Sequence, residues 1–447
     1  MTGSGFFVGG PPTILQSEVP DAILKMATSP MDTSAHDARA ETGLPRERLV
    51  VVGNGMASLR FLERLTEGSP GRFDVTCVGA EPKAAYNRVL LSSLLGGEVD
   101  EAACEFRGLD WYAAHGIRLI TGAPVTQIDR ENGLVLVGET HVLPFDKLVL
   151  AVGSLPIRLP KPGMELPGVI TFRDLADVAA IRKAAVQHAR AIVIGGGLLG
   201  LEAAVGLARL GVETTLLHVM DRLMERQLDH HAAGLVKRAM EARGVRVILK
   251  ADTARVEGDG RVERLVLADG TVLPADLVVM SVGVRPSVAL AQGAGLEIGR
   301  GIKVDDRMTT SDSRVFALGE CAEHRGLIYG LVEPAYEQAD TLARHLAGHN
   351  AAYAGTSLAT SLKVSGLPVF SAGLVDTPED AEAIVLSDPG AGLYRKLLVR
   401  EGRLIGAVFV GDIAEQGACK GLIRSGDPVE NVDDLMFGRP APEPLAA

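Results

Sequence analysis

Two glycine-rich segments, each placed between an apolar run and a helical pattern, have the spacing that binds dinucleotides. Their small residues are Gly53, Gly55 and Ser58 in the first segment, and Gly195, Gly197 and Gly200 in the second. The first glycine of such a loop permits a tight turn, the second lets the backbone approach a pyrophosphate, and the third lets the helix pack closely. Two such loops predict two bound dinucleotides in two related domains, which favours hydride transfer between them.

The residues beside these glycines enter the predicted sites through their positions. Met56 and Ala57 begin one helical pattern, and Leu198 and Leu199 begin the other. Their backbone N–H groups are therefore expected to face a phosphate anion. Glu81 follows the next apolar run after the first loop, where a carboxylate hydrogen-bonds the ribose hydroxyl of a dinucleotide.

The second predicted site lacks this acid. His218 stands at the tip of the corresponding apolar run, residues 214–218. Without a carboxylate there, rejection of a ribose 2′-phosphate is weaker. Arg222 is near enough in the sequence to accept such a phosphate. The choice between NADH and NADPH therefore stays open.

Three further apolar runs end in glycine. These glycines are Gly153, Gly283 and Gly319, and Glu320 follows the last of them directly. In an open parallel sheet, ligands bind beyond the carboxyl ends of the strands. We therefore include these four residues in the predicted cofactor sites.

Composition excludes several classes of partner. The 447 residues carry a net charge of −11, which argues against binding to nucleic acid or to an anionic membrane. No apolar run is long enough for a membrane-spanning helix. The four cysteines lack the spacing of metal or iron–sulfur ligands, so we expect no bound metal, and they fit a reducing cytoplasm. They are Cys77, Cys104, Cys321 and Cys419.

The order of apolar runs and helical patterns predicts an α/β fold. We expect two Rossmann-like domains, the second inserted in the first, and a C-terminal α+β domain. One expected helix runs from His230 to Arg243, with Asp229 as its N-cap. The predicted parts are a disordered extension (1–47), the first domain (48–160 and 285–356), the inserted domain (161–284) and the C-terminal domain (357–447).

Together these segments resemble the flavoprotein reductases that have two dinucleotide-binding domains. Within that family the likeness is greatest to the N-terminal FAD- and NAD-binding portion of the large subunit of NAD(P)H nitrite reductase. The resemblance covers roughly residues 48–440. The matching segments are 52–57, 86–92, 195–203, 223–229, 319–324 and 362–366.

The resemblance implies the cofactors and the activity. FAD is expected in the first site and NADH or NADPH in the inserted one. Electrons would pass from NAD(P)H through FAD to a metalloprotein partner, as in the reductase component of an assimilatory nitrate or nitrite reductase. The chain stops at Ala447 without the cysteine-rich sirohaem part of nitrite reductase, so we expect a separate reductase polypeptide. The resemblance also allows a homodimer, because the C-terminal domain forms a dimer interface in some related proteins.

The resemblance also assigns roles to individual residues. Arg88 is expected near the isoalloxazine ring or the diphosphate, Glu320 at the ribityl chain, and Glu202 beside the nicotinamide as the catalytic residue. Residues 86–93 hold no cysteine, which argues against thiol–disulfide chemistry. Ser93 stands where related ferredoxin reductases have a lysine paired with the equivalent of Glu202.

Two other functions stay open from the sequence. One is a ferredoxin or rubredoxin reductase of another pathway, which differs only in its electron acceptor. The other is a redox-sensing flavoprotein that acts through protein interaction and binds NADH as a switch. Slow flavin reduction with tight retention of oxidised nicotinamide would favour the sensor.

Overall fold

The chain forms two compact units, which are described in turn. The computed structural model describes residues 46–185, 189–357, 359–364 and 366–438. Unit 1 comprises residues 1–84, 107–153 and 287–353, and unit 2 comprises 85–106, 154–286 and 354–447. The extension predicted over residues 1–47 lies outside the described residues, apart from Arg46 and Glu47. The five-part domain division from the sequence stays a prediction.

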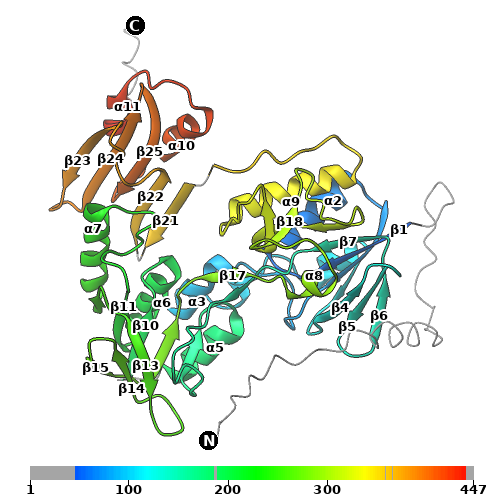
Figure 1. The fold of residues 1–447 in the computed structure, drawn as a ribbon, viewed down its shortest axis with the longest axis horizontal. Coiled ribbons are helices and arrows are strands. Elements are labelled where there is room, and N and C mark those ends of the chain that lie inside the picture. Colours follow the sequence, from blue (N-terminus) through cyan, green and yellow to red (C-terminus); the bar gives the residue numbers. More distant parts are fainter. Residues whose placement is uncertain (1–45, 186–188, 358, 365, 439–447) are drawn as a thin grey trace, which may run out of the picture. The chain divides into compact units, whose positions relative to one another are not determined.

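Unit 1 is built on a five-stranded parallel sheet in the order β19-β7-β1-β2-β3. Its strands read as short aliphatic runs, as expected of strands that are buried on both faces. Helices α2 and α9 pack against each other (Figure 1). The bounds are β1 (Glu47–Val52), α2 (Met56–Gly68), β2 (Phe73–Val78), β3 (Ile117–Ile120), β7 (Lys147–Leu150), β19 (Val315–Ala317) and α9 (Val332–Leu346).

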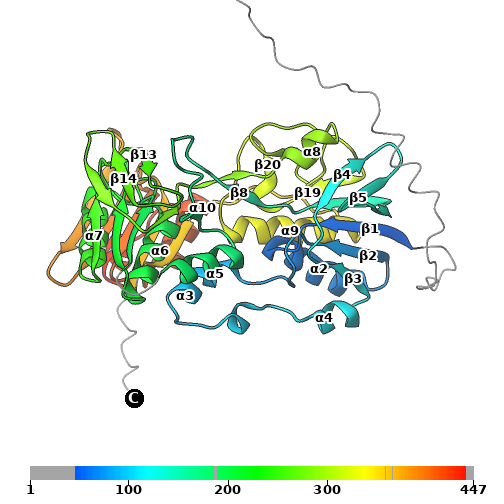
Figure 2. The ribbon, with the colours of Figure 1, turned by 90° about the horizontal axis from the view of Figure 1, so that it is seen from below.

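Smaller elements complete unit 1. An antiparallel sheet of β4, β5 and β6 lies in sequence between β3 and β7, and α8 packs against β4 (Figure 2). The bounds are α4 (Leu109–Ala114), β4 (Val125–Asp129), β5 (Leu134–Val137), β6 (His141–Pro144), α8 (Ala289–Gly293), β18 (Ile302–Val304), the 3-10 helix η3 (Gly319–Cys321) and β20 (Ala322–His324).

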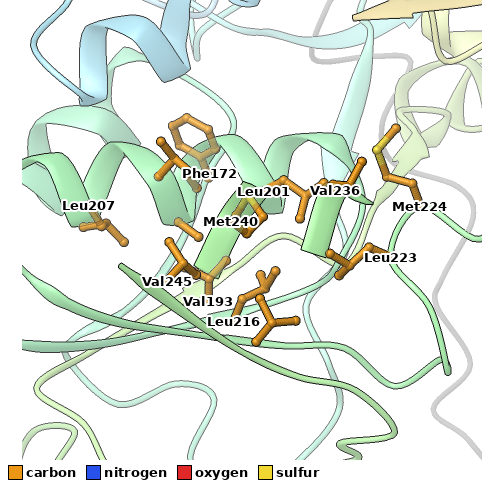
Figure 3. Close-up of a cluster of buried hydrophobic side chains, with 14 of the residues drawn as sticks. Phe172, Val193, Leu201, Leu207, Leu216, Leu223, Met224, Val236, Met240 and Val245 are labelled. Atoms are coloured by element: carbon orange, nitrogen blue, oxygen red, sulfur yellow. The ribbon is translucent and has the colours of Figure 1, made fainter. Parts of the chain in front are cut away.

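Unit 2 contains a second five-stranded parallel sheet, in the order β12-β11-β10-β16-β9. One hydrophobic cluster packs its helices onto this sheet, with Leu201 of α6 and Met240 of α7 lying beside Val193 of β10 (Figure 3). The bounds are β9 (Val169–Thr171), α5 (Leu175–Ala184), β10 (Arg190–Ile194), α6 (Leu198–Arg209), β11 (Glu213–Leu217), α7 (His230–Glu241), β12 (Val245–Ile248) and β16 (Leu277–Met280).

Unit 2 also holds a C-terminal antiparallel sheet, β21-β22-β25-β24-β23, with α10 packed against it. Its bounds are β21 (Ala359–Val364), β22 (Leu367–Gly373), β23 (Glu382–Asp388), β24 (Leu393–Arg400), β25 (Arg403–Val410), α10 (Gln416–Ser425) and α11 (Val432–Phe437). The remaining elements are η1 (Arg88–Leu90), α3 (Leu91–Leu95), η2 (Ala102–Cys104), β8 (Ser154–Pro156), β13 (Thr253–Glu257), β14 (Arg264–Leu267), β15 (Val272–Pro274) and β17 (Val284–Pro286).

The two parallel sheets repeat one design. Gly53 N–H donates to Val78 O at the end of β2, and Gly195 N–H donates to Leu217 O at the end of β11, both at 2.8 Å. The residues that follow these two strands are also equivalent: the N–H groups of Gly79 and His218 donate to the ends of β3 and β12 respectively. The predicted α/β class with two Rossmann-like parts and a C-terminal α+β domain is therefore confirmed.

Candidate functional site

The first glycine loop has a separate structural reason for each of its small residues. Gly53 has φ +103°, and a Cβ there would overlap the carbonyl of Ala151. A Cβ on Gly55 would meet nothing within 4 Å, so this side of the loop is open. Ser58 is buried, and its hydroxyl donates to Gly55 O at 2.9 Å. Gly53 therefore permits the turn, Gly55 leaves space for a ligand, and Ser58 packs closely in the helix.

The second glycine loop shows the same division. Gly195 has φ +121°, and a Cβ there would overlap the carbonyl of Ser281. A Cβ on Gly197 would meet nothing within 4 Å, whereas one on Gly200 would overlap Gly195 O. Of these three glycines, only Gly197 has open space where its side chain would be. A pyrophosphate needs such space to approach the backbone closely.

The helices that follow these loops begin without side-chain caps. Gly55 and Gly197 are the N-cap residues of α2 and α6, and neither helix has a capping hydrogen bond from a side chain or an acid in its first turn. By contrast, Asp174 caps α5 and Asp229 caps α7. The N–H groups at Met56 and Ala57, and at Leu198 and Leu199, are therefore left for an anion. Both loops fit the pyrophosphate of a dinucleotide.

The other residues predicted for the first site gather near its loop. A Cβ on Gly319, which has φ +78°, would lie 3.1 Å from Ala57 Cβ. Gly319 N–H donates to Gln338 Oε1 at 2.8 Å, which fixes the turn that carries the partly buried Glu320. Glu81 follows β2 and Gly153 follows β7, at the carboxyl edge of the sheet where Gly53 also lies. Their binding roles stay predictions.

Sequence reasoning missed a polar contact beneath this loop. Asn54, between the two glycines, accepts a hydrogen bond from the hydroxyl of the buried Tyr112 at 3.0 Å. Its amide nitrogen reaches Lys83 O at 3.5 Å. The side chain thus ties the loop to α4 and to the segment after β2. Nothing in the local sequence links Asn54 to a tyrosine 58 positions away.

Arg88 and Glu202, predicted to act at the flavin and nicotinamide, both belong to unit 2. The Arg88 guanidinium lies over the ring of Tyr86 and donates to Arg173 O at 3.3 Å. Glu202 lies on α6, and its carboxylate is hydrogen-bonded by Ser92 of α3. Burial raises the pKa of Glu202, and the Ser92 hydroxyl offsets only part of that rise.

The two neighbouring serines of α3 have different partners. Ser93, which stands where related reductases have a lysine opposite the glutamate, donates to Glu98 Oε2 at 2.8 Å. Its neighbour Ser92 faces Glu202 instead. One residue of shift along α3 turns a side chain by about 100°, so sequence position alone could not decide which serine meets the glutamate.

Glu202→Gln should stabilise the protein in a pH-dependent way. The ordinary pKa of a glutamate is 4.5, and the pKa of Glu202 in the folded protein is higher. As pH rises from 4.5 through the folded-state pKa, the folded protein loses stability, because the unfolded chain ionises more readily. Glutamine removes that loss. We expect the variant to melt higher than the wild type at pH 7, with the difference vanishing near pH 4. An equal difference at both pH values, measured by differential scanning calorimetry, would contradict this origin.

His218 and Arg222, both close after β11, have partners within the protein. His218 is 7% exposed and turns its ring under the loop, with Nδ1 accepting from Gly196 N–H at 3.0 Å. The Arg222 guanidinium donates to Leu228 O at 3.1 Å and lies 3.3 Å from Asp376. Arg222 thus has acceptors within the protein, and its binding of a 2′-phosphate stays a prediction. Gly283, with φ +106°, accepts from Ile157 N–H beyond β16.

The comparisons with known proteins agree with this geometry. Residues 47–340 match the model of the pyridine nucleotide-disulphide oxidoreductases. The chain belongs to this family. Residues 359–427 match the rubredoxin NAD+ reductase C-terminal domain. The chain is therefore an oxidoreductase of a family that uses FAD and NAD(P)H, as predicted.

Two relatives from Bacillus subtilis concern nitrogen metabolism. A nitrite reductase [NAD(P)H] is 42% identical over 88% of this chain and 49% of its own length. An assimilatory nitrate reductase electron transfer subunit is 41% identical over 83% of this chain and 48% of its own length. The chain thus spans about half of each. A ferredoxin reductase from Rhodopseudomonas palustris has a TM-score of 0.79 and 26% identity, covering 86% of this chain and 96% of its own.

The family name refers to disulphides, but the cysteines of this chain are unsuited to that chemistry. All four are unpaired and buried. Burial raises the pKa of Cys77 to about 12 and that of Cys321 to about 11. It also raises the pKa values of Cys104 and Cys419. Since the thiolate is the reactive form, these side chains are inert near neutral pH.

The described residues include neither a membrane-spanning helix nor a metal-binding cluster. Over residues 46–185, 189–357, 359–364 and 366–438, no helix is long and apolar enough to cross a bilayer. Over the same residues, no group of three or more histidine, cysteine or acidic side chains is arranged to hold a metal ion.

Proposed function

We propose that this chain is the reductase component of an assimilatory nitrate or nitrite reductase. It would bind FAD at the Gly53 loop and NADH or NADPH at the Gly195 loop, and would deliver electrons to a metal centre in a partner protein. The observation that carries the proposal is the pair of open glycine loops, each leading into an uncapped helix. The names of the two Bacillus subtilis relatives support the nitrogen-assimilation partner.

The residues of the chain would bind and orient rather than react. When both cofactors are bound, the nicotinamide supplies a hydride to the flavin, which then releases electrons one at a time to a metal centre. Backbone N–H groups of α2 and α6 would hold the two pyrophosphates. Glu81 and Glu320 would accept hydrogen bonds from sugar and ribityl hydroxyls. Glu202, held by Ser92, would orient the nicotinamide, and Arg88 would contact the flavin or its diphosphate.

A second acceptor class is favoured by a separate observation. The C-terminal match is to the rubredoxin NAD+ reductase domain, and one similar solved structure is a ferredoxin reductase. A small iron–sulfur protein is therefore the runner-up partner. The sensing alternative has no such support, because both Bacillus subtilis relatives carry enzymatic or electron-transfer names.

The acceptor is tested by single-turnover mixing. The FAD-loaded protein is reduced with NADH and mixed anaerobically with a sirohaem-containing nitrite reductase, a molybdenum nitrate reductase subunit, a ferredoxin or a rubredoxin. We expect reoxidation to be fastest, by at least tenfold, with one of the two nitrogen-assimilation proteins. Faster transfer to ferredoxin or rubredoxin would move the protein to another pathway, and no transfer to any of them would overturn the proposal.

Two finer statements remain proposals. A cytoplasmic location is supported by the four unpaired, buried cysteines, which suit a reducing compartment. A homodimer is proposed only from the resemblance to related reductases, and sedimentation of the loaded protein would test it.

A further inference from the structure

His218 connects a carboxylate to the second glycine loop. Its Nδ1 accepts from Gly196 N–H at 3.0 Å, and its Nε2 lies 3.0 Å from Glu225 Oε2. Because Nδ1 is the acceptor, the ring proton belongs on Nε2, which donates to Glu225. The buried imidazole thus joins the loop backbone on one side to a carboxylate on the other.

The segment that carries Glu225 is fixed against the same loop. Met224 N–H donates to Gly196 O at 3.0 Å. A Cβ on Gly196 would lie 2.5 Å from His218 Cγ and 2.8 Å from Leu223 Cδ2, so ring, segment and loop are in close contact. Met224 adopts φ +50°, a left-handed conformation that a non-glycine residue takes when its surroundings hold it there. Glu225 is therefore placed beside the nucleotide loop by packing.

The two sheets show why this carboxylate matters. His218 occupies the position that Gly79 has in unit 1, as the equivalent backbone hydrogen bonds show. The acid of unit 1, Glu81, comes two residues later, and the residue at that later position in unit 2 is Met220, which is 44% exposed. Neither position in unit 2 offers an acceptor for a ribose hydroxyl. Glu225, which comes later in the chain, instead places a carboxylate beside this loop through its contact with His218.

Arg222, on the same segment as Glu225, is held by other groups. Arg222 donates to the backbone oxygens of Leu228 and Glu225, at 3.1 and 3.3 Å. Asp376 lies 3.3 Å from it and balances its charge. The side chain of Glu225 is 28% exposed, and its one ring partner is the neutral His218. Arg222 is therefore occupied by other acceptors, while the Glu225 carboxylate lies beside the loop with the His218 ring as its partner.

We propose that Glu225, positioned by His218, accepts hydrogen bonds from the 2′- and 3′-hydroxyls of the adenosine ribose and makes the second site selective for NADH. This inference rests on the proposed function, since it assumes that the Gly195 loop binds a nicotinamide dinucleotide. A 2′-phosphate would bring a like charge against the Glu225 carboxylate, which disfavours NADPH. Glu225 is thus a specificity-determining residue, and His218 is the positioning residue behind it.

The test measures binding rather than turnover. NAD+ and NADP+ are titrated by calorimetry into the FAD-loaded wild type and Glu225→Gln. We expect the wild type to bind NAD+ more tightly than NADP+. The variant should lose roughly tenfold or more in NAD+ affinity, the size expected for a hydrogen bond to a charged group, without losing NADP+ affinity. His218→Ala should shift the ratio in the same direction but by less.

Asp221→Asn is the matched control, because Asp221 is an acid on the same segment that faces Arg222 and His230 instead of His218. It should leave the NAD+ to NADP+ affinity ratio unchanged. Tighter binding of NADP+ by the wild type, an unchanged ratio in Glu225→Gln, or an equal shift in Asp221→Asn would each overturn the inference. None of these results bears on whether the flavin is reduced. Failure of both NADH and NADPH to reduce it would instead overturn the proposed function.

Discussion

Gly197→Val is expected to yield a folded, flavin-loaded protein that has lost NAD(P)H binding. The position has extended backbone angles, φ −81° and ψ 177°, which valine adopts readily. A side chain there meets no protein atom within 4 Å at its Cβ, so the fold should not be disturbed. It would instead occupy the space into which a pyrophosphate must come to reach the N-terminus of α6.

The expected loss of affinity is large. Two charge-assisted hydrogen bonds to the pyrophosphate, each worth about 1.5–3 kcal/mol, would be broken, which corresponds to roughly a 100-fold loss or more. Calorimetric titration with NAD+ measures it, and the flavin absorbance and melting temperature report the fold. Gly55→Val is the mirror variant and should lose flavin while NAD+ still binds. Wild-type NAD+ affinity in Gly197→Val would contradict the assigned site.

Asp229→Ala should destabilise unit 2 by about 3–5 kcal/mol, the usual cost of leaving one member of a buried ion pair alone. The Asp229 carboxylate accepts from Tyr394 OH at 2.6 Å, from Lys396 Nζ at 3.1 Å and from Ala232 N–H at 3.0 Å. The side chains of Lys396 and Asp229 are only 8% and 12% exposed. The contacts tie α7 to β24 of the C-terminal sheet. Urea unfolding followed by circular dichroism measures the loss.

Two comparisons separate the ion pair from simple helix capping. Asp174 caps α5 through Asp177 N–H without a buried cation, so Asp174→Ala should cost only about 1 kcal/mol. The double variant Asp229→Asn with Lys396→Met removes both charges and should cost less than Asp229→Ala. Equal losses in Asp229→Ala and Asp174→Ala would show that the ion pair contributes nothing beyond the cap.

The same cluster predicts acid sensitivity. Burial acts to raise the pKa of Asp229, but the hydrogen bonds from Tyr394, Ala232 and Lys396 outweigh it and hold that pKa below its usual range. The ordinary pKa of an aspartate is 3.8. An acid whose folded-state pKa is lower than this stabilises the protein above pH 3.8, and the stabilisation is lost as pH falls through the folded-state pKa. The difference in stability between the wild type and Asp229→Ala should therefore shrink below pH 4.

The elements around the glycine loops were predictable because local patterns determine them. The helix expected from Met56 was found over Met56–Gly68, and the helix expected from His230, with Asp229 as its cap, was found over His230–Glu241. Glycine spacing, strand-like aliphatic runs and a capping acid all act over a few residues. Each of these signals is therefore visible in the sequence itself.

Contacts between residues that lie in different elements were not predictable from local patterns. Glu225 meets His218 through a loop whose path depends on the left-handed backbone at Met224. Asp229 meets Lys396 across 167 residues of chain. The local pattern identified Asp229 as a cap but gave no sign of its buried cation. Such pairings follow from the packing of distant elements, on which periodicity carries no information.

The most direct test of the central claim is an anaerobic titration of the FAD-loaded protein with NADH and, separately, with NADPH, following the visible flavin band in a stopped-flow instrument. We expect rapid bleaching with about one equivalent of NADH, and slower or weaker bleaching with NADPH. A protein that holds flavin which neither nucleotide reduces would contradict the assignment of two dinucleotide sites that exchange a hydride.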